Sequence, residues 1–442
     1  MFNTLKPSDS DSARLKRYRE MLDFYNGNQW TSRPGRNEKR LTFNYARVIV
    51  DKITSYLMNG QTVRVTARDK DSEELALEAE QALKYTSLCN NLDLLDYETE
   101  VDAAILGDGC YKVTWDAVLQ RVKVSSPDIQ GIYVRFRGDD TTEIRQVACQ
   151  YTLDEQEMQR LYPGIALSAK AVTSEVWSEK QLEIWVDDTL AVKRRNPYGF
   201  IPFVIFPNLR RAKSFWGVSD IEGIIEPQRE LNRSLSQLSH ILEISGNPIA
   251  VLENVVGAER IAVSPGAVWS LPEDARAYLL DLLQGGGVNL HLGYIDMLYR
   301  VLHDTAESPR AAFGGTSRDI SGVALEVELQ PLLHKVWRKR LIRTAVYRQR
   351  ALLMLRLLGK FTGRDYSALD IEVAWRPVLP KDVSRMIEDE GKLVQSGIHS
   401  RKRAMEGLGI SSPESEFTEW LNERRAILAM NKEFNSKEQR RD

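Results

Sequence analysis

The strongest pattern in the chain is a loop that leads into a long apolar and basic run, from Asp304 to Gly359. Between Val323 and Leu358 apolar residues recur at steps of three and four, which predicts a helix about 50 Å long. Pro331 lies inside this run and lacks an amide hydrogen, so we expect the helix to kink there or to restart as a second helix. The residues that set the repeat are Leu325, Leu329, Leu332, Leu333 and Val336.

In the N-terminal half the spacing of apolar residues changes once, from the spacing of helices to the alternation of strands. Four helices are predicted first, over residues 11–26, from an Asn44 cap to Asn59-Gly60, and over 72–90 and 92–106. After Gly107-Asp108-Gly109 the pattern alternates, which predicts strands. The run from Asn196 to Pro207 is rich in proline and predicts an extended connector. The predicted strands cover residues 110–116, 118–125, 131–137, 143–151, 171–177 and 181–187. This half is therefore predicted to be α+β.

Two helices with a narrow apolar seam follow. Ser219 and Glu222 form a capping-box pattern ahead of the first helix, and Pro227 predicts a bend. The first seam contains Ile221, Ile224, Gln228, Leu231, Leu235, Leu238 and Leu242, and the second contains Val288, His291, Ile295, Leu298 and Leu302. Between them lies a compact insertion, with a strand at Ile249–Leu252, a hairpin around Ser264-Pro265-Gly266, an apolar segment from Tyr278 to Leu283, and Gly285-Gly286-Gly287 at its end. We expect an antiparallel helix pair with this small module at its tip.

The C-terminal part is predicted to be mainly helical. A strand is expected from Ile371 to Trp375, followed by helices near 381–395, 400–407 and 413–430. The last twelve residues, starting at Asn431, are charged and predict a frayed end.

Composition narrows the class of protein. A chain of 442 residues predicts two to four domains or subdomains. The 60 basic and 62 acidic residues give a net charge of −2, which argues against a protein that coats DNA through global positive charge. Three scattered cysteines fit a reducing cytoplasm, and we expect neither a signal peptide nor a membrane span.

The motifs of common enzyme classes are missing. The sequence has no phosphate-binding loop with its lysine, no H-E-x-x-H, no C-x-x-C and no G-x-S-x-G, so we expect no catalytic residue, no metal site and no cofactor. Asp108, Asp116 and Asp128 lie near strands and are the candidates for a two-metal nuclease, although turn residues are the favoured interpretation. His291 and His303 lie on the second seam helix and are expected to be packed or to reach solvent with their tips.

Positive charge gathers at two places in the region from Asp304 to Gly359. Beyond Pro331 the helix contains eight basic residues and no acidic residue among them. We favour the interpretation that they form a solvated face or intersubunit ion pairs over the interpretation that they form a DNA-facing stripe. The eight are Lys335, Arg338, Lys339, Arg340, Arg343, Arg348, Arg350 and Arg356. The loop before it contains Arg310, Phe313, Gly314, Gly315, Thr316, Ser317 and Arg318, which suits weak phosphate binding without base recognition. An ordinary surface loop is the alternative.

The order of these parts resembles the tailed-bacteriophage portal (connector) protein family. NYARVIVDKITSYLMNG, Asn44 to Gly60, is similar to an early helix of that family, and WGVSDIEGIIEPQRELNRSLSQLSHILE, Trp216 to Glu243, is similar to its first stem helix. Ser321-Gly-Val-Ala-Leu325 resembles the start of the family's long helix, and Ser396-Gly-Ile-His-Ser400 resembles a late step. The resemblance covers roughly residues 40–420 and rests on order and spread, since no single motif is diagnostic.

The resemblance implies a ring of about twelve subunits at one capsid vertex, through which double-stranded DNA passes during packaging and ejection. It implies a wing (1–217), a first stem helix (218–245), a clip (246–287), a second stem helix (288–306), a tunnel loop (307–321), a long kinked helix with a return to the wing (322–379) and a helical crown with a tail (380–442). The implied partners are other copies of the chain, the terminase motor, the major capsid or scaffolding protein and the head-tail adaptor. The implied location is the virion, after assembly in the host bacterial cytoplasm.

Within that plan the stem would pack through Ile221, Ile224, Leu231, Leu235, Leu238, Ile295, Leu298 and Leu302. The loop at 307–321 would face DNA, and the basic side of the long helix would make mostly intersubunit contacts. Two other functions are carried as alternatives. One is a metal-dependent nuclease or other nucleic-acid enzyme that uses the carboxylates of the β-rich half, and the other is an adaptor or scaffold without DNA contact.

Overall fold

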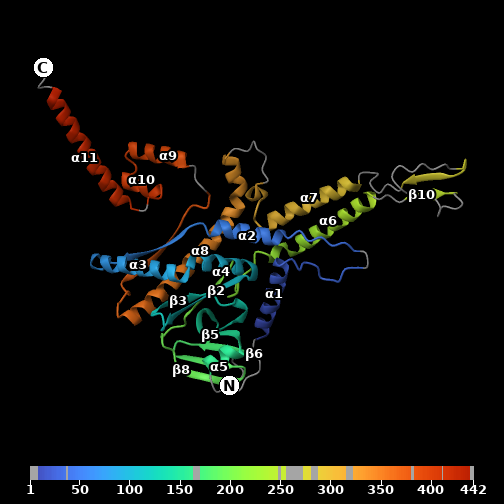
Figure 1. Cartoon of the computed structure of the whole chain (residues 1–442), viewed down its shortest axis with the longest axis horizontal. Coiled ribbons are helices and arrows are strands. Elements are labelled where there is room, and N and C mark those ends of the chain that lie inside the picture. Colours follow the sequence, from blue (N-terminus) through green and yellow to red (C-terminus); the bar gives the residue numbers. More distant parts are fainter. Residues whose placement is uncertain are drawn as a thin grey trace. The chain divides into compact units, whose positions relative to one another are not determined.

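The computed structural model describes residues 8–35, 38–162, 170–246, 250–254, 272–279, 287–314, 322–379, 383–410 and 412–438. These residues form two compact units, with the boundary between Trp375 and Arg376. Blocks of helices and strands follow one another in the first unit, whereas the second is helical in its described part (Figure 1). The predicted α+β class is confirmed.

The helices of the N-terminal part lie where the apolar pattern predicts them. Ser8 and Asp11 form a capping box at the first helix, and the Asn44 side chain accepts a hydrogen bond from the Arg47 amide at the second. Gly107 ends the fourth helix with φ of +97°, a conformation that glycine adopts without strain. The four are α1 (Asp9–Tyr25), α2 (Tyr45–Leu57), α3 (Glu73–Asn90) and α4 (Leu92–Leu106).

Two antiparallel sheets follow α4. The first has the order β3-β2-β9 and consists of β2 (Asp108–Asp116), β3 (Arg121–Ser125) and β9 (Phe203–Pro207). The second has the order β4-β5-β6-β7-β8 and consists of β4 (Ile132–Arg137), β5 (Asp140–Asp154), β6 (Lys170–Trp177), β7 (Gln181–Val186) and β8 (Thr189–Arg195). The short helix α5 (Glu155–Leu161) joins β5 to β6. The predicted strands are present, whereas β8 and α5 were not predicted.

The prediction that residues 196–207 form only an extended connector is wrong at its C-terminal end. Strand β9 pairs with β2, with Phe206 opposite Gly109. Because β9 is an edge strand, Pro207 at its end removes no hydrogen bond from a central ladder. A further small sheet pairs β1 (Gln61–Ala67) with β12 (Leu369–Trp375), which joins the N-terminal part to the segment after the long helix.

The long helix α8 runs unbroken from Gly322 to Thr362, over 41 residues, with Pro331 inside it. The alternative of a second helix that restarts at Pro331 is therefore wrong, while the kink stays a prediction. The carbonyl that Pro331 leaves without a hydrogen-bond donor belongs to Val327, whose side chain is 63% exposed. Water reaches this side of the helix, so the loss of one hydrogen bond does not interrupt it.

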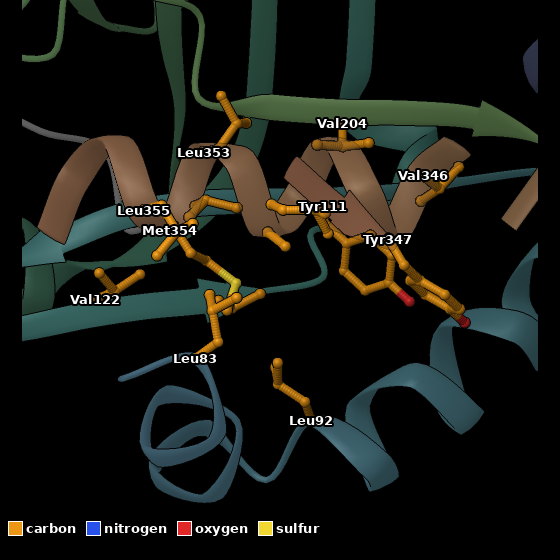
Figure 2. Packing of buried hydrophobic residues seen from close by; sticks show 14 of the residues in the cluster. Leu83, Leu92, Tyr111, Val122, Val204, Val346, Tyr347, Leu353, Met354 and Leu355 are labelled. Atoms are coloured by element: carbon orange, nitrogen blue, oxygen red, sulfur yellow. The ribbon is translucent and has the colours of Figure 1, made fainter. Parts of the chain in front are cut away.

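The main core of the first unit is built around the C-terminal half of α8. Figure 2 shows Met354 of α8 extending toward Leu83 of α3, with Tyr347 further along the same helix. The Tyr347 ring lies 6.5 Å from the ring of Tyr111 on β2. Burial of these aromatic and aliphatic side chains fixes α8 against β2, β3, β9 and α3.

Helices α6 (Ile225–Gly246) and α7 (Gly287–Thr305) form the predicted pair, and they run side by side in Figure 1. The pair of strands β10 (Ala250–Glu253) and β11 (Arg276–Leu279) lies between them in sequence, which confirms the strand predicted near Ile249–Leu252. The hairpin around Ser264-Pro265-Gly266, most of the Tyr278–Leu283 segment, and Gly285 and Gly286 lie outside the described residues.

The predicted start of the first seam helix is corrected. A short 3-10 turn, η4 (Glu222–Ile224), precedes α6, and Ser219 accepts a hydrogen bond from the Ile221 amide, while Glu222 forms an ion pair with Arg211 at 2.7 Å. Ser219 and Glu222 therefore form no capping box. Pro227 lies in the first turn of α6, where an amide hydrogen has no partner within the helix, so the predicted bend is not needed.

The second unit contains α9 (Val383–Gln395), α10 (Arg401–Gly407) and α11 (Pro413–Glu438). The Ser400 side chain caps α10 by accepting from the Arg403 amide, and the Arg401 guanidinium lies 4.2 Å from the centre of the Trp420 ring on α11. The expectation that the chain frays from Asn431 onward is wrong for the backbone as far as Glu438, which is helical.

Candidate functional site

The seam residues lie mostly inside the α6 and α7 pair. Six of the eight side chains predicted to pack there are buried, and Leu235 and Ile295 are half-buried. The buried six are Ile221, Ile224, Leu231, Leu238, Leu298 and Leu302. Their burial within one chain stabilises the pair. Their role in a ring stays a prediction.

A polar ladder on α6 holds the extended segment that precedes α2. Gln228 donates to the carbonyl of Phe43 at 2.7 Å, and the Phe43 amide donates to the Asn232 side chain at 3.0 Å. One turn further, the Ser236 hydroxyl accepts from the Leu41 amide at 3.0 Å. The spacing of four residues places these three side chains on one face of α6, so hydrogen bonds from side chains of α6 to backbone groups fix the N-terminal segment to this helix.

Helix α7 also carries an apolar stripe that this chain leaves exposed. Leu290, Tyr294, Met297 and Val301 are exposed by 77%, 39%, 49% and 41%, and their steps of four, three and four place them on one face. This stripe is distinct from the face with Leu298 and Leu302, which packs inward. Exposed apolar stripes of this kind are typical of surfaces that meet another protein.

The described part of the predicted DNA-facing loop folds back on its own chain. Residues Arg310–Phe313 form a 3-10 turn, η7, which ends at Gly314 with φ of +82°. The Arg310 guanidinium lies 4.8 Å from the centre of the Tyr299 ring and 3.7 Å from Asp296, both on α7. Phe313 packs against His303 with ring centres 5.2 Å apart. Gly315, Thr316, Ser317 and Arg318 lie outside the described residues.

His303 fixes the turn between α7 and η7. Its side chain is buried, and Nδ1 lies 2.6 Å from the carbonyl oxygen of Ser308, so Nδ1 carries the proton that is donated. Burial lowers the pKa of His303, and the Ser308 carbonyl opposes this shift. A packed histidine was expected here, and the structure confirms it. His291, the other histidine of this helix, is half-buried.

A buried carboxylate joins the segment that precedes α6 to the long helix α8. Asp220 forms one ion pair with Lys335 at 3.0 Å and a second with Lys339, and all three side chains are buried. Burial alone would raise the pKa of Asp220, but the two ammonium groups hold it well below its usual value. Lys335 also donates to the carbonyl of Ala306 at 2.9 Å, which ties the end of α7 to the same point.

Arg343 forms the second buried link. Its Nε and Nη2 donate to the two oxygens of Glu100 on α4 at 2.6 and 2.7 Å. Its Nη1 donates to the carbonyls of Pro207 and Asn208, each at 2.9 Å, and Nη2 donates to the Asn208 side chain at 3.2 Å. Every N–H of the guanidinium therefore has an acceptor.

Arg350 repeats this arrangement two turns further along α8. It forms a two-point ion pair with Asp96 of α4, and its guanidinium lies 4.6 Å from the centre of the Tyr111 ring. The interpretation of the basic side of the helix as mostly intersubunit contact is thus wrong for Lys335, Lys339, Arg343 and Arg350, which are buried against acids of the same chain. Arg340 is also buried and donates to the carbonyl of Leu57 at 3.3 Å. Arg338, Arg348 and Arg356 are exposed.

The carboxylates considered for a nuclease do not form a metal site. Asp108 and Asp116 stand at opposite ends of β2, and no group of three metal-ligating side chains occurs among the described residues. Asp116 accepts from the Val118 and Leu119 amides, and Asp128 accepts from the Gln130 amide, so both are turn residues as expected.

Asp108 differs from that expectation because it begins a strand and is buried. It accepts from the Tyr18 hydroxyl at 2.5 Å and from the Gly217 amide at 2.7 Å. Burial raises its pKa to about 6, although the hydrogen bonds from Tyr18 and Gly217 act in the opposite direction. Gly217 allows this approach, since a Cβ there would lie 2.4 Å from the carbonyl oxygen of Gly107.

Sequence reasoning missed the acidic partners of α8. Asp96, Glu100 and Asp220 received no attention, although a helix with several cations and no acid of its own needs acceptors elsewhere once it is buried. One signal was available: Asp96 and Glu100 are four residues apart on α4, so both face one side of the helix.

Comparison with known proteins identifies the family. The model of the family described as "Phage portal protein, SPP1 Gp6-like" matches residues 8–428, nearly the whole chain. No curated protein matches the chain. Among the described helices, none has the length and apolar character that a membrane crossing requires. The chain therefore belongs to the phage portal protein family, SPP1 Gp6-like.

Proposed function

We propose that this chain forms a ring of about twelve subunits at one capsid vertex, as the channel for double-stranded DNA in packaging and ejection. The observation that carries the proposal is the exposed stripe Leu290, Tyr294, Met297 and Val301 on α7. The other face of α7, with Leu298 and Leu302, already packs inside the chain, so the stripe needs a partner from outside. A second copy of the chain would cover the stripe in the same way in every subunit. A contact repeated in this way between different faces closes into a ring when the rotation between neighbouring subunits divides a full turn evenly.

The buried ion pairs support a mechanical role for α8. Asp220 ties α8 to the start of α6, while Glu100 and Asp96 tie it to α4. A wing and a stem joined through fully buried charges resist displacement, because separating the partners would leave a charge without an acceptor in a dry environment. Such stiffness suits a ring through which DNA is driven under force.

The remaining parts take their roles from this plan. The clip at 246–287 would dock the terminase motor and later the head-tail adaptor, and the wing would meet the major capsid or scaffolding protein. The ring would be assembled in the host cytoplasm and remain at the virion vertex. No chemical step is assigned to the chain, because the family is structural and the carboxylates of the β-rich part lie apart.

The loop at 307–321 is the proposed point of DNA contact. Arg310 contacts Asp296 and the half-buried ring of Tyr299 on α7, and its side chain is about half exposed, so it can turn toward a phosphate at little cost. The experiment is to replace Arg310 and Arg318 by Ala in particles that package DNA, and to measure nuclease-protected DNA per capsid. As control, Arg194→Ala with Arg195→Ala removes the same charge from the exposed strand β8.

The loop variant is expected to assemble normally and to package or retain less DNA than the control. Equal packaging by the loop variant, the control and the unchanged protein would return the loop to an ordinary surface segment.

A further inference from the structure

A basic cleft lies at the C-terminal end of α8, in the first unit. It has a volume of about 550 Å³ and lies between the last turns of α8, the segment 364–367 and the strand β12. Its lining includes five cations, Arg68, Arg348, Arg356, Lys360 and Arg364, but only two acids, Asp365 and Asp370. In a chain with a net charge of −2, this excess of positive charge is local.

The two acids of the cleft already have partners. Asp370 accepts two hydrogen bonds from Arg68, at 3.0 and 2.8 Å, which neutralises one cation and one acid together. Asp365 accepts from the Ser367 amide at 2.9 Å and so stabilises its own turn. Arg364 is paired outside the set, with Glu78 at 3.3 Å.

Three cations remain without an ion pair to a carboxylate, although Arg348 adds to the effect of Arg68 in lowering the pKa of Asp370. Within the described part of the chain, Arg348 and Arg356 make no hydrogen bond or ion pair, and Arg356 lies 6.0 Å from the centre of the Phe200 ring. Lys360 donates only a long hydrogen bond, 3.4 Å, to the carbonyl of Tyr198. These three cations are therefore available to an anion from outside the chain.

Their spacing along α8 suits a repeating anion. The helical rise places Arg356 about 12 Å from Arg348 and Lys360 about 6 Å further along the axis, within an arc of about 120° around the helix, and all three line the cleft. Over these roughly 18 Å, one strand of DNA carries about five phosphates. Guanidinium groups bind phosphate oxygens in a two-point manner, which makes unpaired arginines good partners for such a strand.

We propose that this cleft binds the phosphate backbone of a nucleic acid, at a site separate from the loop at 307–321. An acidic protein segment suits the cleft less well, because the centre of a protein interface is poor in charge and rich in apolar contact. Leu352 is the only exposed large apolar side chain described in the lining. The choice of double-stranded DNA as the probe rests on the proposed portal function. The excess of positive charge in the cleft is an observation that does not depend on that function.

The test measures binding of a fluorescent duplex to the full-length chain at several salt concentrations. Three phosphate contacts contribute about −2.7 to the slope of log affinity against log salt. Arg348→Ala with Arg356→Ala should therefore make the slope less steep by about 1.8. The control Lys16→Ala with Arg19→Ala removes the same charge from exposed positions of α1 and should leave the slope unchanged.

Two further arms keep the result interpretable. Arg348→Lys with Arg356→Lys keeps the charge and should retain the slope to within about 0.5. A polyglutamate peptide with the same charge as the duplex should displace it much less well than unlabelled duplex. Equal slopes for the cleft variant and the unchanged protein would overturn the proposal. Slopes that become less steep by the same amount in the cleft variant and in the control would also overturn it. The same holds if polyglutamate displaces the labelled duplex as well as unlabelled DNA does. Imaging of the same samples reports ring formation independently, so failure of the ring and failure of the cleft are told apart.

Discussion

Arg343 on α8 and Glu100 on α4 form a two-point ion pair in which both side chains are fully buried. The residues are far apart in sequence, and the same guanidinium also binds the carbonyls of Pro207 and Asn208 at the end of β9. One side chain thus holds together a helix, a sheet edge and the long helix. Buried pairs of this kind bring geometric definition more than net stability.

Replacing Arg343 by Ala should destabilise the first unit strongly. Removal of the guanidinium leaves Glu100 charged and buried and takes the donors from two carbonyls, so we expect a loss of about 3 to 5 kcal/mol in the free energy of unfolding. Chemical denaturation measures this loss. Arg348→Ala, on the exposed side of the same helix, is the control and should change stability by less than about 0.5 kcal/mol.

The pair as a whole should matter less than either member. Arg343→Met together with Glu100→Met should recover most of the loss seen in Arg343→Ala, because no uncompensated charge remains. Two single variants that each match the double variant in stability would contradict this reading of the pair.

Asp108 should give the protein a stability that depends on pH in the acid range. Its folded pKa of about 6 is above the ordinary value of 3.8. At a pH between these two values the native state therefore keeps a proton on Asp108 that the unfolded chain has lost. Stability from this group is full below about pH 4, falls as pH rises to about 6 and is level above that, with a total change on the order of 3 kcal/mol.

Asp108→Asn should remove the contribution of this group, so the slope should become less steep by that amount, while Asp102, whose pKa is also raised to about 6 by burial, still contributes. The amide cannot lose a proton, and its oxygen can still accept from the Gly217 amide or the Tyr18 hydroxyl. The measurement is the unfolding free energy of variant and unchanged protein from pH 4 to 7, with Asp116→Asn at the half-buried end of the same strand as control. A slope that stays as steep in Asp108→Asn but becomes less steep in the control would place the effect elsewhere.

A charge in the exposed stripe of α7 should prevent assembly without unfolding the subunit. Met297 is about half exposed, so Met297→Glu costs little in the isolated chain but would bury a carboxylate in an interface. Light scattering should show smaller particles with unchanged helicity. Asn289→Glu introduces the same charge at an exposed polar position of the helix and should assemble normally. If both variants assemble alike, the stripe is not the contact.

The elements of this fold were largely predictable because their signals are local. The seam helices repeat at steps of three and four, and α6 and α7 lie where that repeat places them. Asn44 and Gly107 mark helix ends through their own side-chain and backbone preferences. Strand β1 was missed although its sequence, QTVRVTA, alternates and is rich in valine and threonine. Its pairing with β12 joins segments about 300 residues apart, which no local pattern reveals.

The role of the basic helix was not predictable for a related reason. A row of lysines and arginines indicates an exposed face unless their partners are known, and here the partners Asp96, Glu100 and Asp220 come from other elements. Lys339 and Arg343 are buried, which reverses the interpretation of these two residues, whereas Arg348 and Arg356 are exposed as that interpretation requires. The charge pattern alone does not distinguish these two groups.

The most direct test of the central claim is native mass spectrometry combined with electron microscopy of the purified full-length chain. The portal assignment predicts closed rings of about twelve subunits around a hole wide enough for duplex DNA. A chain that stays monomeric at all concentrations, or that forms open or two-fold assemblies without a central hole, would contradict it.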